Sequence, residues 1–394
     1  MKVLYAASMY PPAIGGSQVH MHHLAKTMKR EGHGVEVATM TSRYRTDWLR
    51  MSTIACDPER AYEYEGIPVY QVGFDVATKC RMLPWVLGYY GLMTTSVRHI
   101  SSVIAEKLDG NISRPSLVHA TRVGREFLAH AACSRARKWG VPFLLTANHH
   151  PRWNSPLYRE YTRLYRDADA LFALTDHERQ NLARLSGRSP ESIHVTGVGP
   201  ILSDSFSIEE FREKYNIRGP YVLYLGQQFA YKGALAMARA AETVLRRFPD
   251  IKVVFVGPHT PASRRYFRDV TEPRIVNTGQ VDLAMKTAAL AGCELLCLPS
   301  TQESFGGVFV EAWSFRKAVI GGRIPPIAEL ISEGEEGLLT SQSPSEIADK
   351  ICTLLADQNA RTRMGEAGWR KVQERYTWDK LAKRTEAVYR SLIA

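Results

Sequence analysis

The sequence has few cysteines, and none of them forms a paired motif. Six are scattered along the 394 residues without any C-x-x-C spacing: Cys56, Cys80, Cys133, Cys293, Cys297 and Cys352. Paired spacings are typical of zinc sites and dithiol redox centres, and disulfides need an oxidising compartment. We therefore expect reduced thiols in a cytoplasmic protein, and no bound metal.

Long hydrophobic runs are also missing. The amino-terminal run is too short for the apolar core of a secretion signal and stops at a Pro-Pro pair, so we expect no export. The longest uncharged stretch in the first half, Leu83–Val97, contains Pro84, Gly88 and Gly91 and falls short of the roughly 20 residues of a membrane span. We interpret it as a buried or interdomain helix, with contact at a membrane surface as the alternative.

Two common nucleotide-binding signatures are absent. An NAD-dependent oxidoreductase needs G-x-G-x-x-G after a strand and an acidic residue at the end of the next strand. Neither Gly15-Gly16 nor Gly226 supplies this signature, and the G-K-[ST] of P-loop enzymes does not occur. Both classes are therefore excluded.

The charge is unbalanced, with 51 Lys and Arg against 40 Asp and Glu and a net charge of +11. Such an excess suits a nucleic acid, an anionic membrane or an anionic substrate. A nucleic-acid binder would gather its basic residues on one face with aromatic residues between them, whereas here they are dispersed. We expect no nucleic-acid partner, and the charge supports a weak peripheral membrane contact near Trp85, Tyr89 and Tyr90.

Strand and helix patterns alternate along the chain in two series, which indicates parallel sheets. The predicted strands of the first series are Lys2–Ser8, Val35–Met40, Val69–Val72, Leu117–Ala120, Phe143–Thr146 and Leu171–Leu174. Those of the second series are Tyr221–Gly226, Lys252–Gly257, Arg274–Asn277, Leu295–Leu298 and Ala318–Ile320. Predicted helices include Ser17–Arg30, Leu157–Arg166, Ala234–Arg247 and Val308–Phe315.

This alternation predicts an α/β fold of two Rossmann-like domains that face each other across a cleft. We place the first domain at residues 1–200 and the second at 201–375, and expect the helix of residues 376–394 to return to the first domain. Ligands of open parallel sheets bind beyond the carboxyl ends of the strands. The loops at those ends are therefore the candidate site.

The segment Pro299–Gly322 carries the densest chemical signal. A polar loop with two glycines, Gly306 and Gly307, leads directly into an apolar helix, where free backbone N–H groups suit a diphosphate. Glu303 and Glu311 lie eight residues apart around this junction, and carboxylates accept hydrogen bonds from sugar and ribose hydroxyls. The alternative is that Glu311 complements the helix dipole and Glu303 is solvated.

This segment resembles the E-x7-E signature of the retaining family-4 glycosyltransferases, with their E-[GS]-F-G core. Further elements of that family occur in the same order over most of the chain: Gly15-Gly16, Gly226 with Lys232-Gly233, Gly279–Val281, Gly337–Leu339 and Tyr376–Trp378. The resemblance implies the GT-B fold, a nucleoside-diphosphate sugar donor held mainly by the second domain, and no required metal or cofactor.

The resemblance assigns roles to individual residues. Glu303 is implied to contact the donor sugar, Glu311 the ribose hydroxyls and Lys232 the diphosphate, while Gly16 approaches the donor from the first domain. The other implied donor-binding residues are Gln227, Val281, Ser304, Phe305, Gly306, Gly307 and Val308. In the alternative interpretation Lys232 is an ordinary turn lysine.

The sequence departs from the family pattern at one charged position. Many members carry Arg directly after the glycine that corresponds to Gly226, whereas here the residue is Gln227. A glutamine donates a hydrogen bond but carries no charge. The diphosphate must then depend on Lys232 or recruit another cation, for example Arg264 or Arg265.

A second candidate site follows the predicted strand Phe143–Thr146. The family commonly places a histidine at this strand end, beside the reacting anomeric carbon. Asn148, His149 and His150 each fit one alignment of that motif, and we take His149 and His150 as the catalytic candidates. A neutral imidazole can donate to one hydroxyl and accept from another, and the alternative is a pair of loop histidines.

Two other patterns suggest metal sites but lack the right context. Asp167-Ala168-Asp169 is a D-x-D motif, the metal-binding signature of the other large glycosyltransferase fold, yet it ends a predicted helix. His20, His22 and His23 lie on one helix without suitably spaced Cys or carboxylates, so we interpret them as residues of the helix face.

We therefore expect a glycosyltransferase that moves a sugar from a nucleoside-diphosphate sugar to a sugar or lipid-linked acceptor. Retention of the anomeric configuration is implied by the resemblance alone. The alternatives are a phosphorylase or hydrolase on the same fold, or a non-enzymatic protein that binds anions or nucleic acid.

Overall fold

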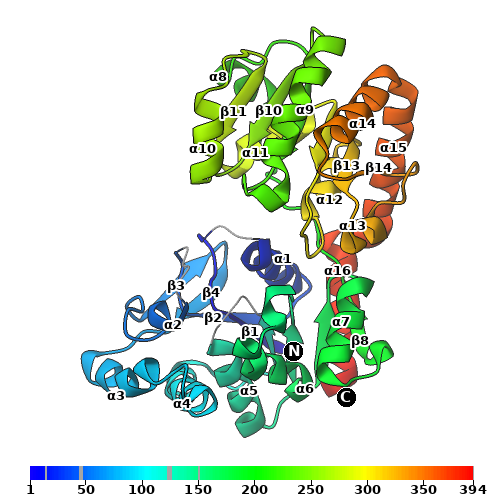
Figure 1. Ribbon diagram of the computed structural model, residues 1–394. Coiled ribbons are helices and arrows are strands. Elements are labelled where there is room, and N and C mark those ends of the chain that lie inside the picture. Colours follow the sequence, from blue (N-terminus) through cyan, green and yellow to red (C-terminus); the bar gives the residue numbers. More distant parts are fainter. Residues whose placement is uncertain (14–15, 44–47, 122–126, 150, 394) are drawn as a thin grey trace. The chain divides into compact units, whose positions relative to one another are not determined.

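The computed structural model describes residues 1–13, 16–43, 48–121, 127–149 and 151–393, which form two compact units (Figure 1). The N-terminal unit consists of Met1–Gly197 together with Trp378–Ala394, and the C-terminal unit consists of Val198–Thr377. The last helix, α16 (Trp378–Ile393), belongs to the N-terminal unit, where it packs against α1 (Gly16–Arg30).

The N-terminal unit is built on an eight-stranded sheet with the order β3-β4-β2-β1-β5-β6-β7-β8. Neighbouring strands are parallel, except for the antiparallel pair of β3 and β4 at one edge. The strands are β1 (Lys2–Ala7), β2 (Gly34–Thr39), β3 (Arg60–Tyr64), β4 (Ile67–Gln71), β5 (Leu117–Thr121), β6 (Phe143–Thr146), β7 (Ala170–Ala173) and β8 (Ile193–Val195).

Helices cover both faces of this sheet, because alternate residues of each strand point to opposite sides. In β1, Tyr5 packs in a core with residues of α1 and α16, whereas Leu4 packs in a second core with the other helices. The other helices are α2 (Trp48–Met51), α3 (Val76–Leu87), α4 (Met93–Asn111), α5 (Leu128–Trp139), α6 (Arg159–Asp167) and α7 (Asp176–Ser186).

The C-terminal unit is built on a six-stranded parallel sheet with the order β11-β10-β9-β12-β13-β14. Its strands are β9 (Tyr221–Leu225), β10 (Lys252–Val256), β11 (Ile275–Gly279), β12 (Leu295–Leu298), β13 (Ala318–Gly322) and β14 (Gly337–Thr340). Its helices are α8 (Ile208–Lys214), α9 (Ala234–Arg247), α10 (Pro261–Arg268), α11 (Leu283–Gly292), α12 (Gly307–Ser314), α13 (Pro325–Leu330), α14 (Pro344–Ala356) and α15 (Gln358–Lys371).

The order of strands in each sheet reverses once along the chain. The reversal lies between β1 and β5 in the N-terminal unit and between β9 and β12 in the C-terminal unit. Loops that leave the carboxyl ends of two such strands diverge to opposite faces and leave a crevice between them, which is where ligands of open α/β sheets bind. These two positions are therefore the places to look for a site.

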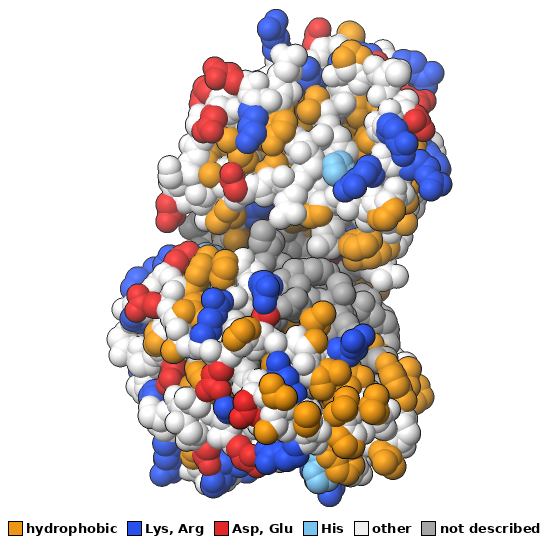
Figure 2. Space-filling model, turned by 90° about the vertical axis from the view of Figure 1, so that its left-hand side faces the viewer, with side chains coloured by type: hydrophobic (Ala, Val, Ile, Leu, Met, Phe, Trp, Pro, Cys, Tyr) orange, Lys and Arg blue, Asp and Glu red, His pale blue; other side chains and the backbone are white. Residues whose placement is uncertain are grey.

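Every strand that the sequence predicts is present, and three short strands, β3, β8 and β14, were not predicted. The segment Leu83–Val97 is not one buried helix, which corrects our interpretation. It contains the end of α3, a turn and the start of α4, because the chain leaves the helix at Gly88. Several of its apolar side chains are exposed, and Figure 2 shows hydrophobic side chains gathered on this side of the N-terminal unit. Of the three aromatic residues that we expected at a membrane surface, Tyr90 is exposed, but Tyr89 is buried and Trp85 is half-buried against His99, which corrects that expectation for these two residues.

Candidate functional site in the C-terminal unit

Two loops meet at the reversal point of the six-stranded sheet. One follows β9 and ends at Gly233, and the other follows β12. The Thr301 amide donates to the Tyr231 carbonyl at 2.7 Å. Gly233 has a left-handed backbone (φ 79°), and a Cβ at this position would lie 2.6 Å from the Pro299 carbonyl oxygen. The K-G element therefore needs its glycine for the contact between the two loops.

Lys232 and Glu303, which the sequence predicts as site residues, form an ion pair in which the Lys232 Nζ lies 2.6 Å from the Glu303 Oε1. Their side chains are only 20% and 9% exposed. A partly buried charge pair costs desolvation energy that a neutral pair would avoid, and such pairs occur both at functional sites and in structural ion-pair networks.

The amino-terminal end of α12 lies directly after the Glu303 loop. Its cap residue is Gly306, with φ 89°, and no side chain caps the first turn of the helix. A Cβ on Gly306 would lie 2.7 Å from the Ile327 side chain, so packing also requires glycine here. The first amides of α12, from Gly307 and Val308, are thus suited to an anionic ligand.

Glu311 lies further along α12, past its first turn, and is 5% exposed. Its Oε1 accepts from the Lys286 Nζ at 2.8 Å and from the Ile201 amide at 3.4 Å. Among the described residues its Oε2 is buried without a hydrogen-bond partner. A buried carboxylate oxygen of this kind costs free energy unless a ligand donates to it, and ribose hydroxyls are suitable donors.

The two glutamines after Gly226 have different environments. Gln227 is exposed, whereas Gln228 is 1% exposed. The Gln228 Nε2 donates to the Asn277 Oδ1 at 2.9 Å, and its Oε1 lies 3.1 Å from the His259 Nδ1. Gln228 therefore joins the loop after β9 to the ends of β10 and β11.

A basic cavity of about 280 Å³ adjoins this network. It is lined by His259, Thr260, Pro261, Arg264, Arg265 and Arg268. Burial, and secondarily the charge of Arg264, lowers the pKa of His259, which favours its neutral imidazole. Because the Thr260 hydroxyl donates to the Gln228 carbonyl at 3.1 Å, the cavity is linked to the loop that carries Lys232.

The remaining predicted donor residues of this unit lie after β12, at the start of α12 or after β11. Phe305 is buried and packs edge-on against Tyr376. Ser304 and Val308 are half-buried beside it, and Val281 is half-buried between β11 and α11.

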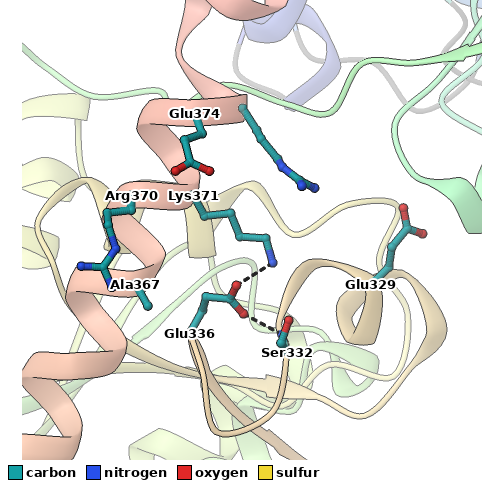
Figure 3. A pocket seen from close by; sticks show the side chains of 8 residues that line it. Glu329, Ser332, Glu336, Ala367, Arg370, Lys371 and Glu374 are labelled. Atoms are coloured by element: carbon teal, nitrogen blue, oxygen red, sulfur yellow. Dashed lines mark hydrogen bonds and ion pairs between the residues drawn. The ribbon is translucent and has the colours of Figure 1, made fainter.

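A second cavity in this unit, of about 410 Å³, lies beside the carboxyl end of α15 (Figure 3). The Lys371 Nζ lies 3.0 Å from Glu336 and donates to the Leu330 carbonyl at 2.7 Å, and Glu336 also accepts from the Ser332 amide. The central charges of this cavity thus hold the chain around residues 330–336 against α15. We assign it a structural role.

In the N-terminal unit, only some of the predicted site residues are described. Gly15 and His150 lie outside the described residues. Gly16 begins α1 and is exposed, and no described atom lies within 4 Å of where its Cβ would stand. The local packing therefore does not explain why this position is glycine.

His149 is buried and both of its ring nitrogens have partners. The Nδ1 lies 3.0 Å from the Tyr165 hydroxyl, and the Nε2 lies 3.0 Å from the Asn154 Oδ1. Asn148 is half-buried at the end of β6 in a left-handed conformation (φ 46°), and its Nδ2 donates to Thr121 at the end of β5. Non-glycine residues with such backbones cluster at functional sites.

Glu178 holds this loop in place. Its carboxylate, which is 5% exposed, accepts from the His149 amide and, at 2.7 Å, from the Leu174 amide. Burial raises the pKa of the Glu178 carboxyl to about 7. Glu178 and Lys286 were not identified from the sequence, because their roles depend on contacts with residues 25 or more positions away.

Several residues of the two metal-like patterns contact other protein groups. Both carboxylate oxygens of Asp169 lie 2.9 Å from Arg137, and one also accepts from the Phe143 amide. His20 and His22 are buried residues of α1, and His23 stacks on Trp378. In the described part of the chain, no group of three His, Cys, Asp or Glu residues is arranged to hold a metal ion.

Two family profiles match consecutive parts of the chain. The profile described as "Glycosyl transferase 4-like domain" matches residues 15–199, and that described as "Glycosyl transferases group 1" matches residues 219–357. The first match falls on the N-terminal unit except for its last two residues, and the second falls within the C-terminal unit.

Three curated relatives have related descriptions. The chain is 30% identical over 196 residues to the phosphatidyl-myo-inositol mannosyltransferase of Mycobacterium tuberculosis, which is 48% of this chain and 52% of that protein. It is 28% identical over 249 residues to the D-inositol 3-phosphate glycosyltransferase of Corynebacterium glutamicum, 59% of each. It is 25% identical over 427 residues to the glycogen synthase of M. tuberculosis, covering 99% and 94%. The chain thus spans about half the length of the first of these relatives.

Solved structures share the whole architecture at low identity. Sucrose-phosphate synthase from Thermosynechococcus elongatus matches with a TM-score of 0.74 at 18% identity, covering 100% of this chain and 99% of that one. HepE of Anabaena in complex with UDP-glucose matches with a TM-score of 0.71 at 16% identity, covering 100% of each chain. The expectation of two Rossmann-like α/β halves is confirmed.

Proposed function

We propose, because the chain belongs to the family-4 glycosyltransferases and has their GT-B fold, that it transfers a sugar from a nucleoside-diphosphate sugar to an acceptor hydroxyl. The observation that best supports this activity is the pairing of Lys232 with Glu303 beside the uncapped end of α12. Lys232 supplies positive charge, α12 supplies free amides, and Glu303 supplies a hydroxyl acceptor.

Donor binding then replaces contacts within the site by contacts to the ligand. The diphosphate binds to Lys232 and to the first amides of α12. Glu303, released from Lys232, then accepts hydrogen bonds from the sugar hydroxyls. Glu311 accepts from the ribose through its buried Oε2, while Lys286 keeps its Oε1 in place. HepE, at 16% identity, was crystallised with UDP-glucose, which is consistent with a donor of this class.

A second cation near the diphosphate replaces the arginine that many family members carry at the position of Gln227. We assign this role to Arg264 or Arg265, because both line the basic cavity whose Thr260 contacts the loop of Lys232. A negative charge that develops on the leaving diphosphate is stabilised by fixed cations placed in advance.

On the acceptor side, Asn148 is the better candidate of the described pair for the strand-end position. His149 has both ring nitrogens engaged, whereas Asn148 is half-buried with a left-handed backbone. No carboxylate of the described site stands out as a glycosyl nucleophile, so we favour a front-face reaction with retention. The acceptor hydroxyl forms the new bond to the anomeric carbon as the bond to the diphosphate breaks, and the diphosphate takes its proton.

Two measurements test this function. A thermal-shift panel of nucleoside diphosphates and their sugars should reveal one matched ligand, because a ligand that binds only the folded state raises its apparent stability. Product analysis with that donor should then give an α-linked product from an α-linked donor. Donor cleavage that needs phosphate in place of an acceptor would instead indicate a phosphorylase.

A further inference from the structure

The outer face of α3 is apolar, although the face of a surface helix that points to solvent is ordinarily polar. Val76 is 77% exposed and Leu87 is 76% exposed, with Leu83 between them at 39%. These residues are spaced by seven and four positions and so share one side of the helix. On its inner side, Met82 and Val86 are buried in the core of the unit.

The apolar surface continues beyond the helix. Tyr90 and Leu92, in the turn before α4, are 62% and 57% exposed. Of the ten large hydrophobic side chains exposed in the described part of the chain, half lie between Val76 and Leu92. The other five are scattered: Leu157, Phe206, Phe229, Leu283 and Ile393. We call Val76, Leu83, Leu87, Tyr90 and Leu92 the α3 patch; it lies on the side of the molecule that faces the viewer in Figure 2.

The charge of the chain is concentrated in the unit that carries this patch. The N-terminal unit contains 29 Lys and Arg against 19 Asp and Glu, whereas the C-terminal unit contains 22 against 21. These counts add up to the 51 and 40 of the whole chain. Arg98 on α4 is exposed close to the patch in sequence, as is Arg81 on α3, which lies 3.3 Å from the exposed Glu106.

We propose that the α3 patch is a docking surface for anionic lipid bilayers. Apolar side chains on one side of a helix enter the interface, and Lys and Arg nearby are attracted to anionic headgroups by about 1 kcal/mol each. The 12 residues of α3 are too few to cross a bilayer, and no helix of the described residues is long and apolar enough to do so. The helix therefore lies along the surface.

Charge argues against a second copy of the chain as the occupant. Self-association through this face would bring two strongly positive units together, whereas an anionic bilayer neutralises them. The docking is independent of the proposed sugar transfer. If that function also holds, docking places the unit that we expect to bind the acceptor at the lipid headgroups and favours a lipid-linked acceptor.

Vesicle flotation of the full chain tests the docking. We expect wild-type protein to float with phosphatidylglycerol-containing vesicles at low salt. With pure phosphatidylcholine vesicles or at high salt it should remain at the bottom of the gradient. Val76→Glu with Leu87→Glu should lower the partition coefficient more than tenfold. The matched control is Leu157→Glu with Ile393→Glu, which makes the same charge change at exposed apolar positions of the same unit. This control should float like wild type.

Three results would overturn the docking surface. The first is wild-type protein that stays at the bottom of the gradient in the presence of anionic vesicles. The second is an equal loss for both double variants, which would show that net charge alone matters. The third is a concentration-dependent dimer that the α3 variant abolishes without any effect on flotation. Circular dichroism and nucleotide-induced thermal shifts, which report on folding and on the C-terminal unit, should be unchanged in both variants and so separate this test from that of sugar transfer.

Discussion

The strand ends of the two units hold their polar groups by different means. In the C-terminal unit two buried carboxylates are neutralised by lysines, Glu303 by Lys232 and Glu311 by Lys286. In the N-terminal unit the loop after β6 is held by uncharged donors and acceptors, and its buried carboxylate, Glu178, accepts only from backbone amides in the contacts described above.

If the proposed function holds, this difference suits the two units to two kinds of ligand. Paired charges, already placed and partly desolvated, can be exchanged for the charges and hydroxyls of an anionic donor at little reorganisation cost. A neutral hydrogen-bonded loop is suited to a neutral reactant, such as a sugar hydroxyl. Substitutions should therefore have their largest effects in the charged site of the C-terminal unit and smaller effects in the loop after β6.

The largest effect is expected from Lys232→Ala. Turnover should fall by about 10²–10³-fold, because the positive charge acts where the diphosphate departs. The affinity for a free nucleoside should change little, since it lacks the diphosphate. Steady-state kinetics and calorimetry would measure the two quantities.

The matched control for this variant is Lys350→Ala. It breaks another Lys–Glu pair of the same unit, Lys350 with Glu333 at 2.7 Å, outside the candidate site. Turnover should survive in the control. Undiminished turnover in Lys232→Ala would mean that a different cation serves the diphosphate.

Glu311→Gln should weaken donor binding by about 1.5–3 kcal/mol, roughly ten- to a hundred-fold in Kd. The amide keeps the size of the side chain and an oxygen for Lys286, but it lacks the charge that strengthens hydrogen bonds from ribose hydroxyls. Titration calorimetry with the nucleoside diphosphate measures the loss. Lys286→Met should cost less, because in our assignment Lys286 contacts Glu311 and the Ile201 carbonyl rather than the donor itself. The reverse ranking would contradict this assignment.

Much of this charged site could be predicted from the sequence, since Lys232, Glu303, Gly306 and Glu311 lie in short motifs. The partners that neutralise or hold them could not. Lys286 reaches Glu311 from a different helix, and the contact between Lys232 and Glu303 spans 71 positions of sequence. Such contacts are set by the order of strands in the sheet, which local periodicity does not determine.

The strands of the fold were predictable because their signal is local in the sequence. Buried parallel strands are continuous apolar runs, and the eleven predicted ones were found. The three strands that were missed, β3, β8 and β14, lie at edges of the two sheets or in an edge hairpin, where the apolar signal is weaker. The expected histidine at the end of β6 was harder to identify, because adjacent polar residues point in different directions from one loop.

Two glycines at helix starts give the next prediction. Gly306→Ala should destabilise the protein by about 1–3 kcal/mol, because its φ of 89° and the nearby Ile327 leave no room for a Cβ. Gly16→Ala should leave stability unchanged but lower activity, if the donor approaches this backbone. Denaturant unfolding together with a rate assay distinguishes the two effects. A Gly16→Ala variant with full activity would remove Gly16 from the site.

The stability of the protein should depend on pH through Glu178, which holds the loop after β6. Its folded-state pKa of about 7 lies above the unfolded value near 4.5, so its contribution to stability is complete below about 4.5 and is lost as the pH rises through about 7. The loss should be on the order of 1–3 kcal/mol. Buried histidines such as His119, whose pKa burial lowers to about 3, act in the opposite direction as the pH falls.

Comparison of variants isolates the Glu178 effect from that of the histidines. The difference in unfolding free energy between pH 5 and pH 8.5 should shift in Glu178→Gln relative to wild type, with the variant losing less stability at the higher pH. The exposed Glu31→Gln serves as a control and should follow wild type. Parallel pH profiles for Glu178→Gln and wild type would mean that this carboxyl does not titrate in the range.

The smallest expected effect is that of metal removal. This experiment tests whether the N-terminal unit uses charged side chains in the reaction. Asp167 and Asp169 are the two carboxylates of the D-x-D motif. The Asp169 oxygens contact Arg137 and the Phe143 amide, so a cation bound there would have to displace the guanidinium. We therefore expect EDTA to leave turnover within about twofold, and Asp167→Ala to do the same. Asp169→Asn should instead lower stability, because Arg137 loses its charged partner. Loss of activity in EDTA that a divalent cation restores, and that Asp167→Ala reproduces, would show that the N-terminal unit also uses paired charges in its chemistry.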